Sequence, residues 1–244
     1  MEIICVSGMM GSGKTTAATF LQKRLGAKCK LVMGDTFNDQ ATKSLLASGA
    51  KGDIATLTRL FDAKIGEFVG AEVERLKAEG ELDYVIVEHR DAVSFKMWEE
   101  ADKRIIVDVD EKTRIERLCN REFEHCKTFE EFKERTENLL ANSPDTTKHA
   151  IDKMIENGEG SGVIRNNGTQ HEYETAVEKC VDRYIEEQIT GHTTPAPAEP
   201  ASKEAEPFDR NAFISATIAG FREKFDNRTK TAGELSEILN SPTL

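Results

Sequence analysis

The chain has 244 residues, of which 38% are hydrophobic and 32% are charged, so it can hold one α/β domain and an appendage. Its formal net charge of -11 excludes a general electrostatic attraction to nucleic acid or acidic lipid, although it leaves room for a local basic groove. No apolar run approaches the roughly 20 residues that span a bilayer, the start of the chain shows no leader pattern, and the cysteines are scattered, so we expect a cytoplasmic protein (host cytoplasm if viral) without membrane contact.

The first predicted strand runs directly into a phosphate-binding loop. Residues 8 to 15 read Gly-Met-Met-Gly-Ser-Gly-Lys-Thr and follow an apolar run at residues 3–6, which is the strand-to-helix setting of the P-loop G-x-x-x-x-G-K-[ST]. Lys14 would reach the β- and γ-phosphates and the Thr15 hydroxyl would bind Mg²⁺. The pattern therefore predicts ATP and Mg²⁺ as ligands. The predicted nucleotide-binding residues are Gly8, Met9, Met10, Gly11, Ser12, Gly13, Lys14, Thr15 and Thr16.

Short apolar runs alternate with amphipathic segments over residues 1–189, and this alternation predicts a doubly wound, five-stranded parallel sheet of the α/β class. The predicted strands are 2–7, 31–34, 84–88, 105–109 and 162–165. The predicted helices are 14–25, 54–79, 111–122, 128–141, 146–157 and 170–189. In such a fold, ligands bind at the carboxyl ends of the strands.

Titratable side chains follow the second and third predicted strands. Asp35 comes directly after the second strand and could accept a proton from, or position, a phosphoryl acceptor. Glu88 ends the third strand, where a Walker B acid would hold Mg²⁺, and Arg90 could grip an acceptor phosphate with its bidentate fork. Helix capping is the alternative role of Asp35, and a structural ion pair is the alternative for Glu88 or Arg90.

The segment after the fourth strand carries arginines at helical spacing, Arg114, Arg117 and Arg121, which cover one narrow face of a helix. Converging arginines stabilise the charge that develops in phosphoryl transfer, so Arg117 and Arg121 are candidate catalytic residues. A solvated, salt-bridged face is the alternative, because glutamates are interspersed. Residues 123–160 have the charged, helical pattern of a mobile lid.

Four prolines cluster before the C-terminal part of the chain and predict a disordered linker over residues 190–207. Beyond it, residues 208–244 form an amphipathic tail whose aromatic stripe includes Phe213, Phe221 and Phe225. A second short helix is predicted from Thr231, where a capping box begins. The tail could fold back over an apolar patch or dock to a partner protein.

Residues 1–189 resemble the nucleotide kinase family, with dephospho-CoA kinase and the phage deoxynucleoside monophosphate kinases as the nearest members. The resemblance rests on the P-loop, on Gly34-Asp35, on the strand and helix that carry Arg114, and on the stretch from residue 163 to residue 168. It implies a helical lid and places Asn167 near the adenine of ATP. The chain departs from these kinases after the second and third strands and lacks the usual lid signatures, which leaves the acceptor open.

The leading hypothesis from the sequence is an ATP-dependent kinase with a nucleotide-like acceptor, either a deoxynucleoside monophosphate or a molecule of the dephospho-CoA type. The catalytic residues would be Lys14, Asp35, Arg90, Arg117 and Arg121, and the metal would lie at Thr15 and Glu88. One alternative is a kinase that phosphorylates a hydroxyl on nucleic acid, such as a hydroxymethylated base in viral DNA. Another is an NTP-switched binding module.

Overall fold

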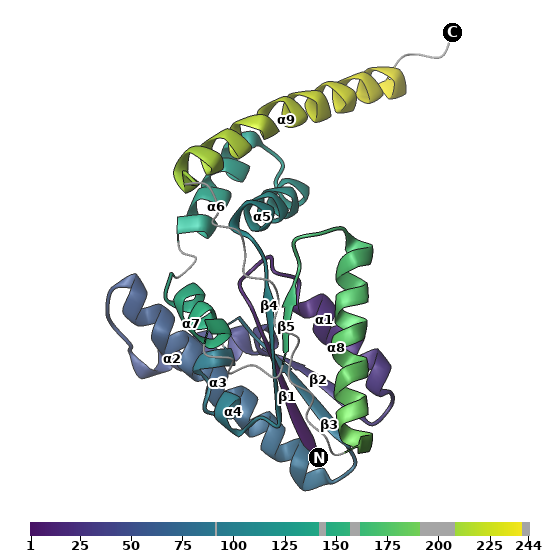
Figure 1. The fold of residues 1–244 in the computed structure, drawn as a ribbon. Coiled ribbons are helices and arrows are strands. Elements are labelled where there is room, and N and C mark those ends of the chain that lie inside the picture. The colour runs from purple at the N-terminus through teal and green to yellow at the C-terminus, as the bar shows by residue number, and fades with distance from the viewer. Residues whose placement is uncertain (91, 142–144, 157–161, 191–207, 241–244) are drawn as a thin grey trace. The chain divides into compact units, whose positions relative to one another are not determined.

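A computed structural model describes residues 1–90, 92–141, 145–156, 162–190 and 208–240. Nearly all of the predicted linker, residues 191–207, lies outside the described residues. Figure 1 shows the described elements as a ribbon.

The central sheet is parallel and has five strands in the order β2-β3-β1-β4-β5. The strands are β1 (Glu2–Ser7), β2 (Cys29–Met33), β3 (Tyr84–Glu88), β4 (Lys103–Asp108) and β5 (Gly162–Arg165). This confirms the predicted α/β fold class, with strand boundaries within about two residues of those expected. Since β1 lies in the middle of the sheet, the P-loop that follows it lies between the ends of β3 and β4.

The described helices include several that the sequence pattern did not indicate. Two 3-10 turns, η1 (Gly34–Phe37) and η2 (Ala92–Ser94), follow β2 and β3. The predicted helices are α1 (Lys14–Leu25), α3 (Ile54–Glu79), α5 (Glu111–His125), α6 (Phe129–Ala141), α7 (Asp145–Glu156), α8 (Gln170–Thr190) and α9 (Arg210–Asn240). The additional helices are α2 (Asn38–Ser48) and α4 (Lys96–Glu100). Only Ala41 of α2 is buried, so this helix carries almost no apolar periodicity to detect.

The two faces of the sheet bury different helices. On β1, Ile3 and Cys5 belong to the core cluster that contains Val69 and Val73 of α3. Ile4 and Val6 belong instead to the cluster formed with α1 and α8, which includes Leu21, Val177 and Val181. This division follows from the alternation of side chains along a strand. It also places α1, which begins at the P-loop, beside α8.

The described residues divide into two compact units: those within 1–109 and 145–190, and those within 110–141 and 208–240. The first holds the sheet. The second holds α5, α6 and α9, so the tail helix shares a unit with α6 of the predicted lid, whereas α7 of that lid belongs to the first unit.

The aromatic stripe of α9 is covered by its own unit. Phe221 and Phe225 are 5% and 4% exposed. Their rings lie 4.7–5.5 Å, centroid to centroid, from Phe123 of α5 and Phe132 of α6. The stripe thus packs within the chain, as one of the two sequence hypotheses for the tail expected.

The predicted break in the tail before residue 231 is wrong. One continuous helix, α9, runs from Arg210 to Asn240. A capping-box pattern starts a helix only where the preceding residues leave helical geometry, and no proline interrupts residues 210–240.

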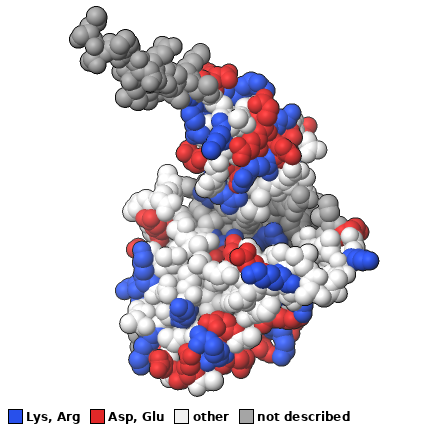
Figure 2. All heavy atoms as spheres, turned by 180° about the vertical axis from the view of Figure 1, so that it is seen from behind, with Lys and Arg blue, Asp and Glu red and all other residues white. Residues whose placement is uncertain are grey.

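Charged side chains of both signs are interspersed on the face that Figure 2 draws. Mixed charge of this kind is typical of a solvated surface rather than of a basic groove that binds the phosphate backbone of a nucleic acid. Among the described helices, none is long and apolar enough to cross a membrane.

Candidate functional site

The P-loop turns sharply before α1 and is held against β5 and α8. Gly13 adopts a left-handed conformation with φ of 97°. A Cβ atom there would lie 2.4 Å from Nδ2 of Asn166, so this position needs glycine for both its backbone angle and its close packing.

Two side chains outside the motif fix the loop. The Asn166 amide donates to the Ser12 carbonyl at 2.7 Å, and the Tyr173 hydroxyl donates to the Gly13 carbonyl at 2.7 Å. Asn166 is itself tied to β4, because its N–H donates to the Asp108 carbonyl at 2.8 Å. The sequence analysis did not assign this role to Asn166 or Tyr173, because the P-loop motif identifies the loop itself but not the distant residues that hydrogen-bond to it.

Lys14 and Thr15 converge on Glu88 at the end of β3. Lys14 Nζ lies 3.5 Å from Glu88 Oε1, and the Thr15 hydroxyl donates to Glu88 Oε2 at 3.3 Å. Burial raises the pKa of the Glu88 carboxyl; Lys14 opposes the rise and the nearby Asp35 charge adds to it. Lys14, which was predicted to bind the phosphates, therefore lies close to Glu88, and Thr15 and Glu88, the two predicted metal ligands, contact each other.

The loop fits a triphosphate with its Mg²⁺. The hydroxyl of Ser12 is buried and has no hydrogen-bond partner among the described residues, which is unusual unless a ligand supplies one. Lys14 offers a cation and α1 offers the positive end of its dipole to an anion. The Thr15 hydroxyl and the Glu88 carboxylate are oxygen donors of the kind that Mg²⁺ prefers.

Asp35 lies exposed beside the buried His89. Its Oδ1 is 3.7 Å from His89 Nε2, and 78% of its side chain is exposed. The His89 ring stacks on Phe95 with centroids 5.1 Å apart. A Cβ atom at Gly34 would lie 2.4 Å from His89 Cδ2, so glycine at the end of β2 allows this packing. Asp35 therefore presents a solvent-accessible carboxylate next to Glu88.

Arg90 forms a half-buried ion pair with Asp62 of α3. Its Nη2 lies 3.5 Å from Asp62 Oδ1, and the Arg90 carbonyl accepts from the Ser7 hydroxyl at 2.8 Å. Asp62 was not among the predicted residues, because a carboxylate inside a long polar helix looks like part of a solvated face.

The predicted arginines of α5 belong to the second unit, so their place relative to the P-loop is not described. Within that unit, Arg121 Nη2 lies 3.2 Å from Glu122 Oε1. Arg114 is buried and pairs with Glu111 at 2.6 Å. The catalytic roles of Arg117 and Arg121 stay predictions.

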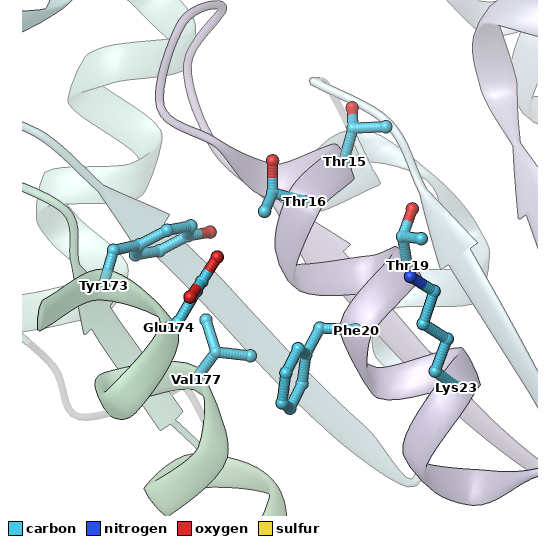
Figure 3. A pocket seen from close by; sticks show the side chains of 8 residues that line it. All are labelled: Thr15, Thr16, Thr19, Phe20, Lys23, Tyr173, Glu174 and Val177. Carbon is cyan, nitrogen blue, oxygen red and sulfur yellow. The ribbon is translucent and has the colours of Figure 1, made fainter. Parts of the chain in front are cut away.

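A pocket opens between α1 and α8, beside the start of α1 (Figure 3). Its volume is about 310 Å³, near the lower end of ligand pockets. It is lined by Thr15, Thr16, Thr19, Phe20, Lys23, Tyr173, Glu174 and Val177. Asn167, predicted to lie near adenine, is exposed and is not among these lining residues, so its role stays a prediction.

The chain is similar to several solved structures. A crystal structure from Thermus thermophilus has 20% sequence identity and a TM-score of 0.49, covering 75% of this chain and 97% of that chain. Shikimate kinase from Bacteroides thetaiotaomicron has 15% identity and a TM-score of 0.45, covering 76% and 98%. The comparison with curated protein sequences finds no match.

A family model described as an AAA domain matches residues 4–138. That range runs from β1 through the P-loop to α6 and covers more than half of the chain. It contains the residues that meet at the loop, including Lys14, Thr15 and Glu88. The expected P-loop family is confirmed, and the chain belongs to the AAA domain family of P-loop NTPases.

Proposed function

We propose that this protein is a kinase that transfers the γ-phosphoryl group of ATP to a nucleotide-like acceptor. The observation that carries the proposal is the convergence of Lys14 and Thr15 on the buried Glu88, with the exposed Asp35 near enough for its charge to raise the pKa of the Glu88 carboxyl. Lys14 and Thr15 are suited to the donor. Asp35 is an accessible carboxylate that is suited to the acceptor.

The transfer needs few groups. An acceptor oxygen, which is a phosphate oxygen of a nucleoside monophosphate or a hydroxyl oxygen of a molecule of the dephospho-CoA type, forms a bond to the γ-phosphorus, the bond from that phosphorus to the β–γ bridging oxygen breaks, and ADP leaves. Asp35 would orient the acceptor and, where the acceptor is a hydroxyl, accept its proton. Lys14 would neutralise charge on the transferring group. A bound Mg²⁺ would supply further charge neutralisation, and Thr15 and Glu88 are the residues that would hold it.

The surroundings of Asp35 support an acceptor with a ring and an anionic group. Phe37 lies two residues after Asp35 and stacks with Phe68, with ring centroids 6.3 Å apart. Arg90, which follows β3 in the same unit, forms a half-buried ion pair with Asp62 of α3. An aromatic wall suits a nucleobase, and a guanidinium suits a phosphate.

A panel of acceptors tests the proposal. We would incubate the full chain with γ-labelled ATP, Mg²⁺ and, separately, each deoxynucleoside monophosphate, dephospho-CoA and DNA that contains hydroxymethylated bases. We expect label in one small-molecule acceptor and its loss in Lys14→Ala. Lys28→Ala is the matched control, because Lys28 is an exposed lysine paired with Asp83.

Each other outcome contradicts the proposal in its own way. Label in modified DNA alone would assign a nucleic-acid kinase. Tight binding of MgATP without transfer to any acceptor would favour an NTP-switched module. Equal transfer by the Lys14→Ala variant would refute the assignment of the donor site.

A further inference from the structure

His89 is a buried polar residue that the proposed transfer has not yet used. Its ring is 4% exposed and packs against both the glycine that ends the loop after β2 and an aromatic ring after β3. A Cβ atom at Gly34 would lie 2.4 Å from His89 Cδ2. The Phe95 ring stacks on the imidazole with an interplanar angle of 19°. The imidazole is therefore enclosed in one orientation.

The backbone around His89 is fixed by three elements of the first unit. Its N–H donates to the Val6 carbonyl of β1 at 3.3 Å, and its carbonyl accepts from the Ala92 N–H of η2 at 3.3 Å. Phe95 is in turn backed by α3, because a Cβ atom at Gly66 would lie 3.0 Å from Phe95 Cδ1. The fold thus sets the place of the imidazole before any ligand binds.

The Nε2 edge of this ring lies next to Asp35. Nε2 is 3.7 Å from Asp35 Oδ1, which is longer than a hydrogen bond. Hydrogen bonds between catalytic groups are often long in ligand-free proteins and shorten when the substrate is bound. Over the described residues 33–48, neither η1 nor α2 uses a side-chain cap, so helix capping does not occupy the Asp35 carboxylate. His89 is in place to orient it.

The charge around Asp35 favours a neutral reacting group. The Asp35 charge helps to raise the pKa of the Glu88 carboxyl, so two carboxylates lie near each other at this end of the sheet. A reacting phosphate oxygen would bring a further negative group to Asp35, and like charges repel. A hydroxyl is neutral and can donate a hydrogen bond to a carboxylate. Arg90 stays suited to an anionic group elsewhere on the acceptor.

We propose that His89 is a positioning residue of the acceptor site, whose Nε2–H orients the Asp35 carboxylate to take the proton of an acceptor hydroxyl. The inference rests on the proposed function and narrows its acceptor to a molecule that reacts through a hydroxyl. The proton passes to Asp35 while the hydroxyl oxygen bonds to the γ-phosphorus and the bond from that phosphorus to the β–γ bridging oxygen breaks. Both the imidazolium and one neutral tautomer carry a hydrogen on Nε2, so the role does not depend on the charge of the ring.

Two substitutions of His89 separate its hydrogen-bond donor from its ring. His89→Phe keeps an aromatic ring to stack on Phe95 and removes the donor. His89→Gln removes the ring and keeps an N–H donor. For each variant we would measure the melting temperature, the MgATP affinity, and kcat and KM for the member of the acceptor panel that the wild type labels.

The two variants should differ in opposite directions. We expect His89→Phe to keep its melting temperature and MgATP affinity while kcat falls by roughly tenfold to hundredfold, because a small misplacement of a reacting group can cost about 10²-fold. His89→Gln should melt at a lower temperature yet retain most of kcat. His171→Phe changes an exposed histidine of α8 and is the matched control, which should behave as the wild type. Phosphorus NMR of the product should show a phosphate ester.

Several results would overturn the inference. Wild-type kcat in His89→Phe together with slow transfer by His89→Gln would assign the ring a purely structural role. If His89→Phe does not fold, the kcat of His89→Gln decides alone: retention supports the donor role and loss refutes it. A phosphoanhydride product would exclude the hydroxyl and leave the proposed kinase standing, whereas a wild type that labels no acceptor would refute the kinase and this inference together.

Discussion

Replacing Asn166 with alanine removes the side chain that ties the P-loop to β5. Asn166 is 4% exposed and its amide donates to the Ser12 carbonyl at 2.7 Å. The variant leaves a buried carbonyl without this donor, which costs about 1–3 kcal/mol. For a protein of this size, that loss corresponds to a fall in melting temperature of roughly 2–12 °C.

The substitution should also weaken nucleotide binding, because the loop must then be ordered by the ligand rather than by the fold. We would measure thermal unfolding without nucleotide and MgATP affinity by titration. Asn211→Ala, at an exposed position near the start of α9, is the control. An Asn166→Ala protein with the wild-type melting temperature and affinity would refute the claim that this hydrogen bond holds the loop.

Three further substitutions test the packing around the site and in the second unit. Gly34→Ala should destabilise the protein by about 1–3 kcal/mol, because the added methyl group overlaps the buried His89 ring; denaturation at the wild-type midpoint would contradict this. Phe225→Ala should cost about 3–5 kcal/mol in the second unit, seen as faster hydrogen exchange in α5 and α6, and unchanged exchange there would argue against packing of the tail. Burial acts to raise the pKa of Glu111, but hydrogen bonds from Arg114 and Arg210 and their charges outweigh it and hold the pKa below its ordinary value of 4.5. The stabilisation is therefore present above pH 4.5 and is lost as the pH falls through the lowered pKa. In the Glu111→Gln variant, α9 should therefore exchange its amide hydrogens faster than in the wild type at neutral pH and at the same rate in acid. A difference in exchange that persists in strong acid would count against this linkage.

The sheet and the donor loop were predictable because both are encoded locally. Continuous apolar runs mark strands that are buried on both faces, and β1, β3 and β5 match their predicted ranges. The P-loop is a contiguous motif with a mechanical reason at each fixed position. Such features need no knowledge of which distant residues meet.

The rest of the site depends on contacts that are remote in sequence. Asn166 meets Ser12 across 154 positions, and Arg90 meets Asp62 across 28. Asn166 is followed by another asparagine, and nothing in the local pattern shows which of the two turns inward. Periodicity reports that a face is buried, but not what buries it.

The C-terminal tail also shows that a sequence can reveal a buried face without revealing its partner. Its aromatic stripe predicted a buried face, and Phe225 is buried. The partner rings on α5 and α6, such as Phe123, lie about 100 positions earlier in the chain and have their own helical pattern. Two complementary faces can be recognised separately in a sequence while their pairing is visible only in the fold.

The central claim is that Asp35 serves an acceptor while Lys14 and Thr15 serve the donor. Its most direct test is the rate of label transfer from γ-labelled ATP to the identified acceptor by the wild type and by Asp35→Asn, with MgATP affinity measured on the same samples. We predict equal affinity for MgATP and transfer slowed by roughly 10²–10⁴-fold, the usual contribution of a positioned acid–base group. Wild-type transfer by Asp35→Asn, or a parallel loss of ATP binding, would contradict the claim.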